Sequence, residues 1–284
     1  AIQKKMIPIT TPTLCVDVCG TGGSEKNRFN TSTAVAFICA SLGISTAKHG
    51  NRGSKKSNGS FDFLESLNIP FGQSVTQLER ILSSNNLCFM FARNHHPELK
   101  KIAEARSKIK SKTIFNLIGP LCNPGNVNYQ IIGTPDNETA QILALAKKEL
   151  GTKNSFIIAG FNGLDELTNT GASQIFNINN NQINNFVFEP ESIGISLKKE
   201  ADIEGGTSEE NAKIFLSILE KRHSEHPIAE LVCLNAGLAL HCVNQVKSIK
   251  EGFLIAKRSI DNGSSYEFFK EYKNNVTYFE NPKN

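Results

Sequence analysis

Apolar and polar residues along this chain form two kinds of block, short apolar runs and longer segments with helical spacing. The apolar runs predict strands at 14–18, 44–47, 87–92, 130–133 and 155–159. The longer segments predict helices at 33–42, 60–67, 74–82, 97–108 and 138–150. Because strands and helices alternate, the sequence indicates the α/β class, with a mostly parallel central sheet flanked by helices.

Turn-forming residues mark several ends of these elements. Gly43 directly follows the helix predicted at 33–42, and Ser74 opens the one predicted at 74–82. Glycine commonly ends helices and serine commonly begins them. A segment with six Asn among its nine residues, 177–185, predicts a polar hairpin tip or loop rather than a functional tract.

Composition narrows the class of protein. The 284 residues are enough to bury a large core, and 39% of them are hydrophobic, as in ordinary globular proteins. A net charge of +4 is too small to indicate nucleic-acid binding and suits a protein that handles anionic small molecules. No apolar run reaches the length of a membrane span, and Ala1 to Met6 lack a signal-peptide core, so we expect no membrane association.

The cysteines indicate the cellular compartment. There are seven of them, an odd number with no C-x-x-C pair, and several lie inside apolar runs. This pattern predicts buried free thiols rather than disulfides or a zinc site. Free thiols are typical of a reducing compartment, so we expect a cytoplasmic location.

A glycine-rich turn follows the first predicted strand. Gly20, Gly22 and Gly23, with Thr21 among them, allow the backbone to adopt positive φ and to approach a ligand closely. Their N–H groups can converge on a phosphate. The spacing fits neither G-x-G-x-x-G nor G-x-x-x-x-G-K-[ST], so it supports neither a dinucleotide site nor a nucleoside-triphosphate site. Taken alone, such a turn is more often only a tight loop.

Two polar segments near this turn strengthen the case for a phosphate site. Asn30 can cap the helix that follows it, and the N–H groups of a first helical turn attract anions. The hydroxyls of Ser32 and Thr33 can reach a phosphate or a metal. Lys48 and Arg52 follow the next strand and add mobile positive charge at the sheet edge where a doubly wound fold gathers its loops.

His95, His96 and Arg106 form a third candidate cluster. A helix that starts near Pro97 places Arg106 roughly three turns from His96. Two adjacent histidines point in different directions, which disfavours a metal site made by both. A histidine and an arginine can instead hold a planar carboxylate, although a capping histidine and a surface arginine explain the same residues.

Asp165 and Glu166 are adjacent carboxylates after the strand predicted at 155–159. Mg²⁺ takes one or two carboxylates and completes its shell with water and substrate phosphate, so the pair suits a polyphosphate ligand. It suits a glycosidase less well, because glycosidase carboxyls face each other across a cleft. An isolated pair of this kind is more often solvated charge in a turn.

Together these motifs resemble the anthranilate phosphoribosyltransferase family, which has a nucleoside-phosphorylase-like fold. Each motif is weak alone, but they occur in the family's order over nearly the whole chain, so their joint specificity is high. The resemblance rests on residues 17–23, 30–33, 48–52, 95–97, 113–121 with Asn123 and Pro124, 163–166 and 234–237.

The resemblance implies that the amine of anthranilate displaces pyrophosphate from C1 of 5-phosphoribosyl-1-pyrophosphate (PRPP), with two Mg²⁺ ions in each active site. It implies PRPP binding by Gly20, Thr21, Gly22, Gly23, Asn30, Ser32, Thr33 and Lys48. It implies anthranilate binding by Asn51, His96, Arg106, Gly119 and Pro120. It assigns the metal to Ser32, Asp165 and Glu166, and it assigns no covalent nucleophile.

The chain departs from the family pattern in two ways. Ser24, followed by Glu25, stands where the family usually has Asp, so a metal-linked carboxylate is lost or displaced by one residue. The family's small helical domain is expected to be incomplete at the N-terminus, with 1–13 and 74–94 as its remnant and hinge. Residues 14–73 and 95–284 would then form the large α/β domain. The family implies a homodimer, whose interface the missing helices would weaken.

Two other functions stay open at this point. Pyrimidine nucleoside phosphorylases share the fold, although residues 48–52 favour the transferase. A non-catalytic relative that binds nucleic acid could use the basic pairs at 55–56 and 100–101, but the mild net charge argues against it.

Overall fold

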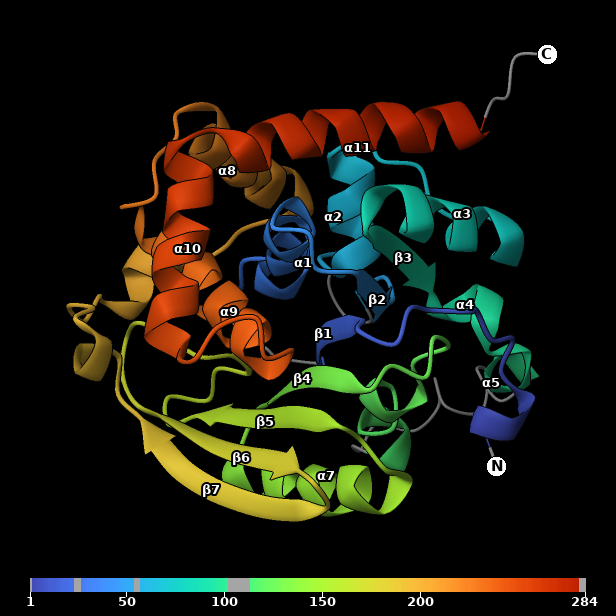
Figure 1. Cartoon of the computed structure of the whole chain (residues 1–284), viewed down its shortest axis with the longest axis horizontal. Helices are drawn as coiled ribbons and strands as arrows, with labels where there is room; N and C mark the ends of the chain where they lie inside the picture. Colours follow the sequence, from blue (N-terminus) through green and yellow to red (C-terminus); the bar gives the residue numbers. More distant parts are fainter. Residues whose placement is uncertain (1, 23–26, 54–56, 102–112, 281–284) are drawn as a thin grey trace.

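A seven-stranded sheet runs through the structure, a computed structural model that describes residues 2–22, 27–53, 57–101 and 113–280 (Figure 1). The strand order is β3-β2-β1-β4-β5-β6-β7. The first five strands in this order pair in parallel, and β6 and β7 are antiparallel, which confirms the predicted mostly parallel sheet. The strands are β1 (Val16–Gly20), β2 (Thr46–Gly50), β3 (Leu87–Phe91), β4 (Tyr129–Thr134), β5 (Asn154–Gly160), β6 (Ser173–Asn179) and β7 (Gln182–Phe188).

Helices cover both faces of this sheet (Figure 1). On one face α1 packs against β1 and β2, and α9 packs against β4 and β5; on the other face α7 packs against β4 to β7. The α-helices are α1 (Thr31–Ser41), α2 (Ser60–Ser66), α3 (Val75–Asn85), α4 (Ala92–His95), α5 (Pro97–Lys101), α7 (Asn137–Leu150), α8 (Ser208–Glu220), α9 (Pro227–Cys242), α10 (Ile249–Asp261) and α11 (Ser264–Glu280). Short 3-10 helices are η1 (Gln3–Lys5), η2 (Ile114–Asn116), η3 (Pro120–Cys122), η4 (Pro190–Ile193) and η5 (Glu200–Ile203).

Each face of the sheet has its own hydrophobic core. The larger core surrounds α1, which is buried on almost every side because its sequence from Ala34 to Ala40 is apolar throughout. Phe37 of α1 lies at the centre of this core, with its ring 5.3 Å from that of Phe89 and 5.7 Å from that of Phe215. The smaller core lies between the sheet and α7. The sheet is therefore held rigidly from both sides.

The predicted elements are confirmed, with ends that differ by a few residues. The helix predicted at 97–108 is described only as far as Lys101. The Asn-rich segment forms the β6–β7 hairpin, as expected. Its turn contains Asn180 and Asn181, with φ of 49° and 61°, a conformation that asparagine tolerates better than most residues.

Part of the segment assigned to a small helical domain lies in the central sheet. β3 is the edge strand and pairs with β2 from Leu87 to Phe91, and α3 packs against it. The N-terminal segment is tied to the same region, because the Ile7 N–H donates to His95 O (2.8 Å) and Gln3 Nε2 donates to Leu121 O (2.7 Å). The division into two domains stays a prediction, and β3 goes with the large domain.

The expectation for the cysteines is confirmed, since all seven are buried and unpaired. Burial raises the pKa of Cys15 to about 12, so its thiol stays protonated and unreactive. Among the helices of the described residues, none is both long enough and apolar enough to cross a membrane.

Candidate active site

The order of the strands reverses at β1, because β2 and β3 lie on one side of it and β4 and β5 on the other. In open α/β sheets, ligands bind outside the carboxyl ends of the strands at such a point. A cavity of about 690 Å³ opens here, and Gly20, Gly50 and Gly133 at the ends of β1, β2 and β4 line it. Its volume is typical of small-molecule sites.

Most of the predicted site residues line this one cavity. They are Gly20, Thr21, Gly22, Asn30, Ser32, Lys48, Asn51, His96, Gly119, Pro120, Asp165 and Glu166. Thr33 does not: it lies about 100° around α1 from Ser32 and is only 1% exposed. The predicted residues Gly23 and Arg106, and the unusual Ser24 and Glu25, lie outside the described residues. Which ligand each of the predicted site residues binds stays a prediction.

Lys48 is a fixed cation at one wall of the cavity. Its Nζ donates hydrogen bonds to Val18 O (2.7 Å) and to Ser32 Oγ (3.0 Å), and the residue is 1% exposed. Burial lowers the pKa of Lys48, whereas the charge of Asp17 raises it. The expectation that Lys48 provides mobile charge is wrong. Because both acceptors are neutral oxygens, the ammonium can still attract an anion.

Asp17 lies behind Lys48 and connects three parts of the site. Its Oδ1 accepts from the His49 N–H (3.2 Å), and its Oδ2 accepts from Gln130 Nε2 (3.0 Å), which also donates to Pro120 O (2.6 Å). Burial raises the pKa of Asp17, and the charge of Lys48 lowers it. Sequence reasoning missed Asp17 and Gln130. The available signal was a polar side chain inside a buried parallel strand, where apolar residues are the rule.

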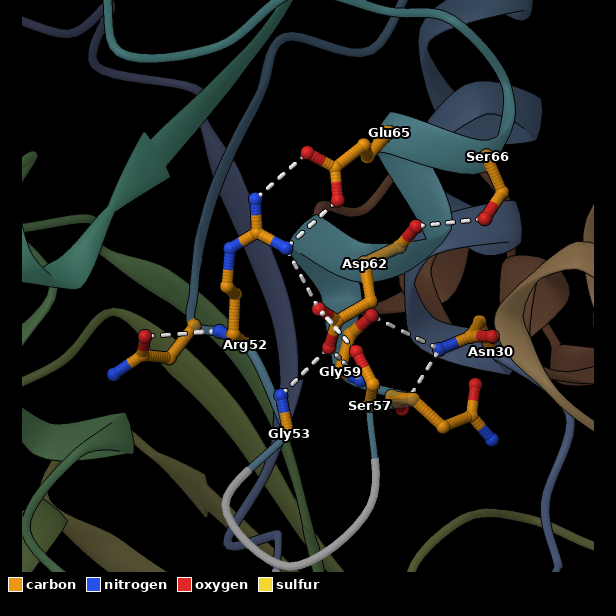
Figure 2. Close-up of polar contacts among 10 residues, drawn as sticks. Asn30, Arg52, Gly53, Ser57, Gly59, Asp62, Glu65 and Ser66 are labelled. Carbon is orange, nitrogen blue, oxygen red and sulfur yellow. Dashed lines mark hydrogen bonds and ion pairs between the residues drawn. The ribbon is translucent and has the colours of Figure 1, made fainter.

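Asn30 stands at the N-cap position of α1, but its side chain makes no capping hydrogen bond. Its Nδ2 instead donates to Asn58 O (3.3 Å) and Gly59 O (3.4 Å), as Figure 2 shows. The N–H groups of the first turn therefore have no side-chain cap from Asn30, and a helix start of this kind binds anions well. Asn30 also ties α1 to the loop before α2.

Arg52 lines the cavity and belongs to an ionic network with Asp62 and Glu65 (Figure 2). Its Nη1 contacts Asp62 Oδ1 (3.0 Å) and Glu65 Oε2 (2.7 Å). Asp62 is 3% exposed and also accepts from the N–H groups of Gly53 and Gly59, both at 2.8 Å. The expectation of mobile charge at Arg52 is thus wrong too. The network instead closes the loop that carries Asn51 and Arg52.

The adjacent histidines point in different directions, as expected. His95 Nδ1 lies 2.8 Å from Ile7 O, whereas His96 Nε2 turns to the cavity wall and lies 3.2 Å from His49 Nε2. Burial lowers the pKa of His49 to about 3, and burial also lowers the pKa of His96. The two rings are therefore neutral near pH 7. His49, which also lines the cavity, was not selected from the sequence.

Asp165 and Glu166 line the same cavity, close to the end of β1. Two glycines give their loop room: a Cβ at Gly20 would lie 2.7 Å from Asp165 Oδ2, and a Cβ at Gly133 would overlap the backbone of Asp165. The close approach predicted at Gly20 therefore serves a protein carboxylate. Arg28 donates to Asp165 Oδ1 and, at 2.5 Å, to Gly163 O.

The carboxylate wall offers oxygen ligands to a divalent cation. Burial raises the pKa of Glu166 to about 7, while the Thr31 hydroxyl and Arg28 lower it. Because neighbouring groups offset little of the cost of burying the charged carboxylate, a bound cation would stabilise its ionised form strongly. Together with Ser32, these are the hard oxygens that Mg²⁺ prefers. Within the described ranges no three His, Cys, Asp or Glu residues gather into a metal site, so substrate oxygens would have to complete the shell.

The cavity at the switch point, with the start of α1 in its lining, agrees with the class found by sequence comparison. The chain matches the glycosyl transferase family, a/b domain, over residues 13–266. An anthranilate phosphoribosyltransferase of Desulfitobacterium hafniense strain Y51 is 38% identical over 273 residues, which cover 96% of this chain and 81% of that protein. The enzyme of the same name from Halalkalibacterium halodurans is 40% identical over 248 residues, covering 87% and 72%. The chain belongs to the anthranilate phosphoribosyltransferase family.

Solved structures agree with this assignment. The crystal structure of anthranilate phosphoribosyltransferase from Thermus thermophilus has a TM-score of 0.90 and 28% identity, and the match covers 98% of this chain and 82% of that one. The Saccharomyces cerevisiae enzyme in complex with PRPP and Mg has a TM-score of 0.89 at 24% identity, covering 97% and 77%. The latter likeness concerns the fold alone. The family and fold class expected from the motifs are confirmed.

Proposed function

We propose that this chain transfers the 5-phosphoribosyl group of PRPP to the amine of anthranilate and releases pyrophosphate. The observation that carries the proposal is the distribution of charge in one cavity. Lys48, whose Nζ donates to neutral oxygens, and the carboxylates of Asp165 and Glu166 all line it. Such a cavity suits a polyphosphate that arrives with a divalent cation.

The chemistry follows from where charge develops. The amine nitrogen forms a bond to C1 as the bond between C1 and the pyrophosphate oxygen breaks. That electron pair leaves with pyrophosphate, and the nitrogen releases one proton to solvent to give the neutral secondary amine. Lys48 and the first turn of α1 stabilise the growing negative charge. An aromatic amine is neutral at pH 7 and already nucleophilic, so the enzyme mainly has to orient it.

The two substrates occupy different ends of the cavity in this proposal. PRPP contacts the glycine turn at 20–23, Asn30, Ser32 and Lys48, with Thr33 supporting it from within α1. Anthranilate contacts Asn51, His96, Arg106, Gly119 and Pro120. Gln130 Nε2 donates hydrogen bonds both to Pro120 O (2.6 Å) and to Asp17 Oδ2 (3.0 Å). Gln130 therefore links Pro120, at the anthranilate end of the cavity, to Asp17.

Mg²⁺, when bound, neutralises charge on the pyrophosphate. We assign Ser32 to one ion, on the phosphate side, and Asp165 with Glu166 to a second. We also propose a homodimer in the cytoplasm, and light scattering on the purified protein measures the mass that this requires.

Loss of anthranilate fluorescence in the presence of PRPP and Mg²⁺ tests the function directly. We expect the loss to require protein, PRPP and Mg²⁺ together and to stop when EDTA is added. A parallel reaction with thymidine and phosphate should yield no thymine. Stable fluorescence combined with thymidine cleavage would overturn the proposal in favour of a nucleoside phosphorylase.

A further inference from the structure

Arg28 already holds the carboxylate that the proposed function gives to a metal. Its Nη1 donates to Asp165 Oδ1, and its Nη2 donates to Gly163 O at 2.5 Å. The side chains of Arg28 and Asp165 are 14% and 18% exposed, and both residues line the cavity. Neither the sequence motifs nor the family resemblance pointed to Arg28. The ion pair thus lies inside the proposed active site.

The backbone of Arg28 is anchored firmly. Its carbonyl oxygen accepts from Asn58 Nδ2 (3.0 Å) and from Asn211 Nδ2 (2.9 Å), and it forms a β-bridge with Glu204. Any rearrangement of Arg28 is therefore a rotation of its side chain about a fixed main chain. The guanidinium can turn within the cavity without unfolding the loop that carries it.

The guanidinium is only partly satisfied where it lies. Its Nε is buried and has no hydrogen-bond partner, although the two Nη atoms are bonded. Burial lowers the pKa of Arg28, and the charges of Glu166 and Glu200 raise it. An arginine with a free donor gains most from a ligand that offers several oxygens in one plane, and phosphate is such a ligand.

A divalent cation at Asp165 would lie beside the Arg28 guanidinium, so the two positive charges would repel each other and compete for the same carboxylate. Asp165 Oδ1 cannot accept from the guanidinium and coordinate a metal in the same direction. We propose that Arg28 covers Asp165 in the free enzyme and moves to the pyrophosphate of PRPP when the substrate arrives, which frees the carboxylate for Mg²⁺. Arg28 is then a substrate-binding residue that also delays metal binding until substrate is present. This inference rests on the proposed function.

The exchange links the two ligands thermodynamically. PRPP takes Arg28 away from Asp165 and so raises metal affinity, and metal raises PRPP affinity by the same factor. Replacement of Arg28 should therefore move the two affinities in opposite directions. A residue with a purely structural role would weaken both, because its loss would disturb the whole site.

Mn²⁺ titration followed by electron paramagnetic resonance measures this without turnover. Compared with the unmodified protein, Arg28→Gln should bind Mn²⁺ roughly tenfold more tightly in the absence of PRPP, and PRPP roughly tenfold more weakly with Mg²⁺ present. In the variant, PRPP should increase Mn²⁺ affinity by a smaller factor than in the unmodified protein, because only the contribution of substrate oxygens to the metal shell remains. Arg28→Lys keeps the positive charge but loses the planar guanidinium with its paired donors. Its Mn²⁺ affinity should therefore lie between those of the unmodified protein and Arg28→Gln.

Arg52→Gln is the matched control, because Arg52 lines the same cavity but pairs with Asp62 and Glu65. It should leave Mn²⁺ affinity unchanged. If neither Arg28 variant binds Mn²⁺ more tightly than the unmodified protein, the inference is overturned. Failure of the proposed function is a separate result, because it appears as absent anthranilate turnover in the unmodified protein whatever the Mn²⁺ titrations show.

Discussion

Two basic residues that line the cavity, Lys48 and Arg28, are held in different ways. Lys48 donates to a backbone carbonyl and a hydroxyl, whereas Arg28 donates to the carboxylate of Asp165 and to a backbone carbonyl. The carboxylate near Lys48, that of Asp17, acts on it through its charge without accepting a hydrogen bond from it, whereas the carboxylate of Asp165 accepts directly from Arg28. The difference shows that lining a cavity does not make a cation ready for an anion. What matters is the charge on its partners.

Lys48→Met is the strongest test of this contrast. Removing this cation should lower kcat/KM for PRPP by about 10³-fold, which is the order of effect of a well-placed electrostatic donor. Steady-state kinetics with anthranilate fluorescence measure it.

Lys147→Met provides the matched control. Lys147 of α7 is also a buried lysine, 7% exposed, and its pKa is likewise lowered by burial and raised by the charge of Asp17. It does not line the main cavity. We expect activity within a few-fold of the unmodified protein. Equal losses in both variants would mean that buried charge in general, and not the position of Lys48, supports activity.

Asp17→Asn tests what keeps Lys48 charged. The asparagine amide can accept only one of the two hydrogen bonds, from His49 N–H or from Gln130 Nε2, so we expect about 2–3 kcal/mol of lost stability in urea unfolding. Because the charge of Asp17 raises the pKa of Lys48, its loss should also move the alkaline limb of the kcat/KM profile to lower pH. An unmoved alkaline limb would show that Asp17 has only a structural role.

The wall that holds Lys48 also contains His49, which makes stability depend on pH. The unfolded chain binds a proton at His49 near pH 6.5, but the folded protein binds it only near pH 3. Its contribution is therefore complete above pH 6.5 and is lost as pH falls, by about 2 kcal/mol between pH 6.5 and 5. Urea unfolding at several pH values should show a flatter slope for His49→Gln. A slope unchanged by His49→Gln would contradict the assignment.

Much of the Lys48 wall could be predicted because its residues are close in sequence. The glycine turn, the start of α1 and the end of β2 lie within about thirty residues, and a β-α-β unit brings them together in a fixed way. The same local reasoning failed for Thr33, since a one-residue step on a helix turns a side chain by about 100°. To predict whether a hydroxyl faces the cavity or the core, one must know the exact residue at which the helix begins.

The contact between Arg28 and Asp165 could not be predicted in the same way. Arg28 and Asp165 are 137 positions apart, and no local pattern relates them. Their contact depends on the loop at 163–166 lying directly on Gly20 and Gly133, which only the packed sheet defines. Asp17 and Gln130 left a weaker trace, because polar residues in buried strands need partners. A polar residue in a buried strand shows that it must have a hydrogen-bond partner, but the sequence does not show which residue that partner is.

The smallest expected effect comes from Arg52, where the same contrast between partners recurs at the rim. Glu65 is well exposed and Asp62 is buried, although both contact the same guanidinium. Glu65→Gln should change stability by at most about 0.5 kcal/mol, because solvent screens an exposed pair. Asp62→Asn should cost about 1–2 kcal/mol, because asparagine cannot accept from Gly53, Gly59 and Arg52 together. Urea unfolding of the two variants side by side measures the difference, and equal losses would show that Arg52, rather than the backbone N–H groups, is the main partner of Asp62.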